Sequence, residues 1–149
     1  MHYVEVDQSG KMESTNTATV LAFSDAISDS IMIPAAVKRQ AIRILRERGM
    51  TGATLYPLLF AIALYLLLRD YTETLALVII DQEYAGQERI IKAHLMNLMN
   101  RNGYDLPAQN VGFRRIGKRS PAHKLALETL RGKRKPGRII GLGDLLSEL

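Results

Sequence analysis

The stretches VEVDQ at residues 4–8 and VIIDQ at residues 78–82 decide the predicted fold of this chain. Each is a run rich in β-branched residues that ends in Asp-Gln, which is typical of a strand with a carboxylate at its C-terminal end. Paired strands lie roughly 5 Å apart, so side-by-side placement would bring Asp7 and Asp81 together. Close carboxylates repel each other unless a proton or a metal ion lies between them, so the repetition indicates a metal site. The alternative is coincidence, because Asp often begins turns.

The composition predicts one folded domain over residues 1–149. Of the 149 residues, 47% are apolar and 23% are charged, which excludes a disordered or low-complexity chain. The chain has no cysteine, so disulfides and thiolate metal sites are excluded. No basic region followed by an apolar one occurs at the N-terminus, so we predict no signal peptide and expect a cytoplasmic protein.

One uncharged segment requires a choice between a membrane helix and a buried helix. No charge occurs between Arg48 and Arg69, and residues 53–68 are almost wholly apolar. A spanning helix needs about 20 apolar residues. Polar or helix-weakening residues shorten this run: Gly49, Thr51, Gly52, Thr54 and Pro57. We therefore expect the helix to be buried in protein, against a sheet, with no membrane contact. An anchor at residues 55–68 is the alternative, which cell fractionation would detect.

Hydrophobic periodicity predicts the order of the elements. Strands are expected at residues 2–7, 17–24, 30–33, 74–80 and 111–116, and helices at 34–48, 55–69, 87–101 and 120–130. Residues 139–149 are expected to form a tail with one helical turn at its end. The predicted order is β-β-β-α-α-β-α-β-α, which is an α/β fold without a linker long enough to divide domains.

This order, with one aspartate on the first strand and another at the end of the fourth, resembles the ribonuclease H-like superfamily. That superfamily includes RuvC-type Holliday-junction resolvases, ribonucleases H, transposases and integrases. The resemblance covers almost the whole chain in element order, and in sequence it rests on VEVDQSGK and VIIDQE. It implies a five-stranded mixed sheet with helices on both faces, in which the first and fourth strands are parallel neighbours. It also implies that Asp7 and Asp81 bind Mg²⁺ or Mn²⁺ for phosphodiester hydrolysis.

The resemblance further implies a third acid or histidine on the last helix. The sequence offers His123 and Glu128. Ser120-Pro121 is a typical helix start, which places His123 in the first turn with its ring free to reach the aspartates. The third metal ligand stays open between His123, Glu128 and another residue. An acid from the helix after the third strand would have to be Glu47, near the end of that helix.

Other acids near the aspartates have more than one interpretation. Glu5 shares a strand face with Asp7 and is either a further ligand or the partner of a base such as Lys11. Glu83 and Glu88 follow Asp81, and the dipole of the next helix explains both.

The C-terminal part of the chain is strongly basic. The net charge is +5, and between Arg114 and Arg138 only Glu128 opposes ten lysines and arginines. Dense basic clusters attract nucleic acid because binding releases its counterions. The predicted nucleic-acid contacts are Lys118, Arg119, Lys133, Arg134, Lys135 and Arg138. A solvated surface that only aids solubility is the alternative.

The leading hypothesis is a Mg²⁺- or Mn²⁺-dependent nuclease that acts on structured nucleic acid, with Asp7, Asp81 and His123 as catalytic residues. The alternative is a non-catalytic module on the same fold that binds nucleic acid or another partner. That alternative predicts no third polar group near the two aspartates. The sequence does not distinguish DNA from RNA, and a homodimer stays open.

Overall fold

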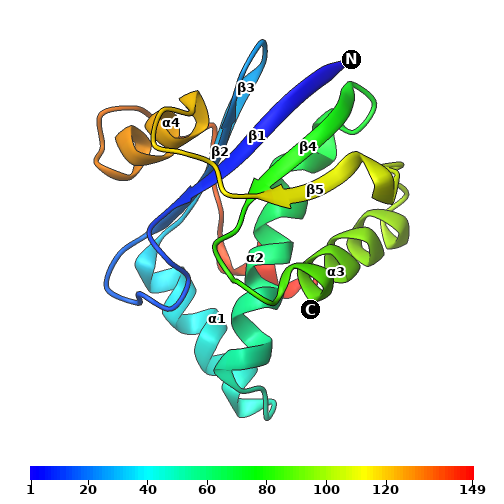
Figure 1. The fold of residues 1–149 in the computed structure, drawn as a ribbon. Helices are drawn as coiled ribbons and strands as arrows, with labels where there is room; N and C mark the ends of the chain where they lie inside the picture. The colour runs from blue at the N-terminus through cyan, green and yellow to red at the C-terminus, as the bar shows by residue number, and fades with distance from the viewer.

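The computed structural model describes all 149 residues and shows an α/β fold around a six-stranded mixed sheet (Figure 1). The strands are β1 (His2–Ser9), β2 (Thr19–Ser24), β3 (Ser28–Ile33), β4 (Leu75–Asp81), β5 (Val111–Arg114) and β6 (Arg138–Ile139). The helices are α1 (Ala35–Glu47), α2 (Gly52–Leu68), α3 (Glu88–Arg101), α4 (Pro121–Leu130) and α5 (Leu142–Leu146). Short 3-10 helices occur at Arg69–Tyr71 and Ala108–Asn110.

The strand order across the sheet is β5-β4-β1-β2-β3-β6. β1 pairs antiparallel with β2, and β2 with β3, whereas β4 is parallel to both β1 and β5. Thus β1 and β4 are parallel neighbours, and their register aligns Val6 with Ile80. Asp7 and Asp81 are the next residues on these two strands, so both carboxylates lie at one end of the sheet.

The elements from β1 to α4 follow the predicted order, but the prediction of five strands is wrong. The sixth strand, β6, has two residues and pairs in parallel with the edge of β3. No periodicity can be read from so short a run. Its approach depends on Gly137, where a Cβ atom would lie 2.0 Å from the Asp29 Oδ1 and 2.8 Å from the Ser30 carbonyl oxygen. The tail beyond it forms α5, which is longer than the single turn expected.

Helices cover both faces of the sheet, but unequally (Figure 1). α4 alone covers one face, where Leu125 and Ala126 pack on Val20 and Ala22 of β2. The other helices cover the opposite face, which holds the main core. β4 is fully buried on one face only. Leu77 and Ile79, on the face that carries Asp81, are only half-buried, because α4 packs mainly on β1 and β2. Ala76 is exposed where the pairing register of β1 and β4 shifts by one residue.

The apolar segment Gly52–Tyr71 is the one helical stretch long and apolar enough to span a membrane, with a mean hydropathy of 1.6. However, 67% of its most apolar window is buried inside the protein, where α2 packs against α3, α1 and the sheet. This burial is consistent with a soluble protein. α2 begins three residues earlier than predicted, so Pro57 lies beyond its first turn.

Lys38 of α1 is a charged residue that the fold buries, and it is only 1% exposed. The ammonium donates hydrogen bonds to the carbonyl oxygens of Lys11 (3.0 Å) and Ser14 (2.7 Å) and to the Thr19 Oγ1 (2.9 Å). Burial lowers the pKa of Lys38 to about 8, against a smaller opposing effect of Glu13. These three bonds hold the loop between β1 and β2 on α1.

Replacing Lys38→Met should lower the free energy of unfolding by about 2 kcal/mol near neutral pH, because three oxygens lose a charged donor. The folded protein releases this proton at about pH 8 and the unfolded chain at 10.5. Between these values the unfolded chain binds more protons, so wild-type stability should rise with pH relative to Lys38→Met. Urea titrations on either side of pH 8 measure the difference. The matched control is Arg39→Met, which removes an exposed bond to the same loop, and a pH-independent difference would contradict the prediction.

Candidate metal centre

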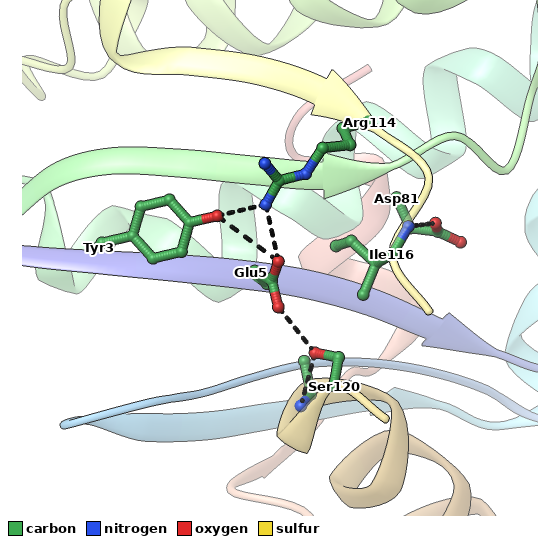
Figure 2. Close-up of polar contacts among 7 residues, drawn as sticks. Tyr3, Glu5, Asp81, Arg114, Ile116 and Ser120 are labelled. Carbon is green, nitrogen blue, oxygen red and sulfur yellow. Dashed lines mark hydrogen bonds and ion pairs between the residues drawn. The ribbon is translucent and has the colours of Figure 1, made fainter. Parts of the chain in front are cut away.

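Asp81 is the last residue of β4, and Asp7 lies beside it near the end of β1, with both side chains on the face covered by α4. Alternation along β1 and β4 produces this placement, because Val6 and Ile80 enter the core on the opposite face. Asp7 is 3% exposed, and its Oδ1 accepts the Gln8 N–H at 2.8 Å. The Asp81 Oδ1 accepts the Ile116 N–H at 2.6 Å (Figure 2). Backbone donors therefore orient both carboxylates.

Glu83 joins these two aspartates in a three-carboxylate cluster. One carboxylate oxygen from each of Asp7, Asp81 and Glu83 lies within 4.8 Å of the other two. The attribution of Glu83 to a helix dipole is wrong, because α3 begins only at Glu88. The chain instead turns directly after β4, where the Glu83 N–H donates to the Asp81 carbonyl oxygen at 2.9 Å. The Asp-x-Glu spacing of Asp81 and Glu83 at the end of a strand is the sequence pattern that could have identified Glu83 as a member of the cluster.

Burial and the neighbouring carboxylates raise the pKa values of Asp7 and Glu83. Burial raises the pKa of Asp7, although hydrogen bonds from the Gln8 amide and His123 oppose the shift. The pKa of Glu83 rises to about 8, first through burial, then through its hydrogen bond to the Asp81 carboxyl group and the charges of Asp81 and Asp7. Lys11 is the cation that opposes this rise. Near neutral pH the cluster therefore retains a proton that a divalent cation could replace.

His123 lies at the same site, with its Nδ1 2.7 Å from the Asp7 Oδ2. The predicted helix start explains this position. Ser120 is the N-cap of α4, and its Oγ accepts the Ala122 N–H at 3.3 Å, with Pro121 as the first helical residue. An ionised Asp7 can only accept a hydrogen bond, so the His123 Nδ1 carries the proton of this bond. The other ring nitrogen of His123, Nε2, is then the one available for a second contact.

The other acids considered from sequence lie outside the cluster. Glu128 pairs with Arg134 at 3.3 Å, and Glu47 is exposed at the end of α1. The partner of Glu5 is Arg114 rather than Lys11, with 2.9 Å between the Glu5 Oε2 and the Arg114 Nη2 (Figure 2).

The predicted nucleic-acid contacts fall into three settings. Lys118 and Arg119 are exposed between β5 and α4, directly before the helix that carries His123. Lys133, Arg134 and Lys135 are exposed in the loop after α4. A cavity of about 220 Å³ beside this loop is lined by Ser28, Asp29, Ser30, Leu125, Arg134, Lys135 and Gly137. Arg138 lies in β6 and pairs with Asp144 at 2.9 Å.

The raised pKa of Glu83 makes stability depend on pH when a chelator removes metal ions. The folded protein holds this proton up to about pH 8, whereas the ordinary pKa is 4.5. Between these values the folded state binds more protons, so stability conferred by a protonated Glu83 is lost as pH rises. Wild-type stability should therefore fall across this range relative to Glu83→Gln in urea titrations. Glu88→Gln is the matched control, and a constant difference for Glu83→Gln would contradict the titration.

The chain has no significant match to any protein-family model, curated protein or solved structure.

Proposed function

We propose that this protein is a divalent-metal-dependent nuclease for structured nucleic acid, built on a ribonuclease H-like fold. The observation that carries the proposal is the placement of Asp7, Asp81 and Glu83, with ligand oxygens within 4.8 Å of one another. Three carboxylates offer the hard oxygen ligands that Mg²⁺ and Mn²⁺ prefer. Burial and the neighbouring carboxylates Asp81 and Asp7 raise the pKa of Glu83, which is the environment in which a divalent cation would replace a bound proton.

The topology supports the fold assignment. Within the sheet, the order β5-β4-β1-β2-β3 places β1 and β4 side by side and parallel, as the resemblance implies. β6 and α5 are additions beyond the expected set of elements.

His123 and Glu83 favour catalysis over the non-catalytic alternative. A binding module predicts no third polar partner near Asp7 and Asp81, yet both a carboxylate and an imidazole lie there. A bound divalent ion would supply an activated water and stabilise the leaving oxygen. The Asp7 carboxylate orients the ring of His123, whose Nε2 then accepts or donates a proton at a reacting oxygen.

The surrounding cations suit a polyanionic substrate. Lys118 and Arg119 lie directly before the helix that carries His123, and Lys133, Arg134 and Lys135 lie beyond its other end. In this proposal both groups contact phosphates, so a substrate backbone would extend along α4 from the carboxylate cluster. DNA and RNA would present the same phosphates to these side chains.

The nuclease proposal is tested with Asp7→Asn and His123→Ala on a panel of duplex DNA, RNA–DNA hybrid and four-way junction. Cleavage should require Mg²⁺ or Mn²⁺. Asp7→Asn should weaken Mn²⁺ binding, measured by titration calorimetry, and abolish cleavage. His123→Ala should slow cleavage by about 10² to 10⁴ if the ring transfers a proton, without an equal loss of thermal stability.

Glu47→Gln is the matched control, because this acid is exposed and outside the cluster. Unchanged Mn²⁺ affinity in Asp7→Asn would overturn the metal site. Metal binding without cleavage of any of the three substrates would favour the non-catalytic module.

The phosphate contacts predict a salt dependence. Replacing Lys133, Arg134 and Lys135 by Ala should weaken binding to all duplex DNA sequences alike, because phosphates carry no sequence information. Each lost phosphate contact should reduce the slope of log affinity against log salt by about one. Fluorescence anisotropy over a salt series measures this slope, with the exposed Arg43 of α1 replaced by Ala as the control. An unchanged slope would show that the loop only contributes to solubility.

A further inference from the structure

We propose that Glu5 is a positioning residue that fixes residues 115–119, here called the basic segment, as the contact for the phosphodiester backbone beside the carboxylate cluster. This inference rests on the proposed function and deepens it, because it assigns how the substrate backbone is held at the same site. Glu5 itself would touch neither metal nor substrate.

One end of the basic segment is fixed through Arg114. The Glu5 Oε2 lies 2.9 Å from the Arg114 Nη2, which also contacts the Tyr3 hydroxyl (Figure 2). Tyr3 and Glu5 are two residues apart on β1, so both point to the same face of the sheet. The Glu5 ion pair thus holds the end of β5 above the central strand.

The other end is fixed through Ser120. Its hydroxyl donates to the Glu5 Oε1 at 3.0 Å and accepts the Ala122 N–H at the start of α4. The two oxygens of one carboxylate therefore bind the residues immediately before and after the basic segment (Figure 2).

A third attachment lies inside the segment, where the Ile116 N–H donates to the Asp81 Oδ1 at 2.6 Å. Ile116 is also buried at 8% exposure. The backbone of the segment is therefore bonded directly to one of the three cluster carboxylates, which places the segment at the edge of the candidate metal centre.

The remaining side chains of the basic segment are all cationic, apart from Gly117, which has no side chain. Arg115, Lys118 and Arg119 are exposed and form no ion pair. Three unpaired cations held next to a site for a divalent ion suit the phosphates on either side of a scissile phosphodiester.

The contacts of Glu5 argue against a role as a metal ligand. Both of its oxygens already have partners, and Arg114 compensates its charge. The cluster oxygens come from Asp7, Asp81 and Glu83. Neutralising Glu5 should therefore leave the metal site intact and loosen the basic segment.

The test measures binding of Glu5→Gln to a labelled DNA duplex and a labelled RNA–DNA hybrid by anisotropy, and Mn²⁺ binding by calorimetry. Nucleic-acid affinity should fall roughly fivefold or more, an effect in the range for coupled neighbouring residues. Mn²⁺ affinity should be unchanged, and on any substrate that is cleaved KM should rise more than kcat falls. Glu47→Gln is the matched control, because it neutralises an exposed acid that lies outside the site.

A double-mutant cycle separates positioning from a general structural effect. In a variant with Arg115, Lys118 and Arg119 replaced by Ala, Glu5→Gln should cause no further loss of affinity, because the cations on which Glu5 acts are gone. If Glu5→Gln fails to fold, Arg114→Met removes the same ion pair through its exposed partner. Arg114→Met then replaces Glu5→Gln in the double-mutant cycle.

Two results would overturn the inference. A loss of Mn²⁺ affinity as large as that in Asp7→Asn would make Glu5 a metal ligand. Unchanged nucleic-acid affinity, or an equal loss in the variant without the three cations, would remove Glu5 from substrate positioning. These binding measurements need no cleavage. Failure of this inference can therefore be distinguished from failure of the nuclease proposal.

Discussion

The parallel pairing of β1 with β4 is the constraint on which the rest of the structure depends. Val4, Val6, Val78 and Ile80 are at most 1% exposed on the core side of these strands. A slip of one residue would turn these side chains outward and bury Asp7 in the core, so apolar burial fixes the register. Once the register is set, two carboxylates must lie side by side on the opposite face, and the direct turn after β4 adds Glu83.

Three neighbouring carboxylates repel one another and destabilise the folded chain. Hydrogen-bond donors from the surrounding segments offset part of this repulsion. The amides of Gln8 and Ile116 and the ring of His123 bond to the two aspartates. The Tyr84 hydroxyl accepts the Met12 N–H at 3.3 Å, which ties the turn after β4 to the loop between β1 and β2. Lys38 holds that same loop on α1. The candidate site is thus supported by two helices and three loops.

Periodicity and local signals predicted much of this arrangement. The repeated strand with Asp-Gln led to the meeting of Asp7 and Asp81, and Ser120-Pro121 led to the position of His123, because these depend on short-range rules. Glu83, the burial of Lys38 and the pairing of Glu5 with Arg114 were missed, because each depends on contacts between segments distant in sequence or on turn geometry. β6 was missed because a strand of two residues has no period.

The central claim is that Asp7, Asp81 and Glu83 form one divalent-cation site. A crystal structure of the protein grown with Mn²⁺, with anomalous diffraction data collected at the manganese edge, tests this most directly. We expect an anomalous peak bonded by at least one oxygen from each of the three carboxylates, at about 2.0 to 2.2 Å, the distance typical of a small hard cation. A saturated crystal with no peak at this cluster, or with manganese bound only elsewhere on the surface, would contradict it.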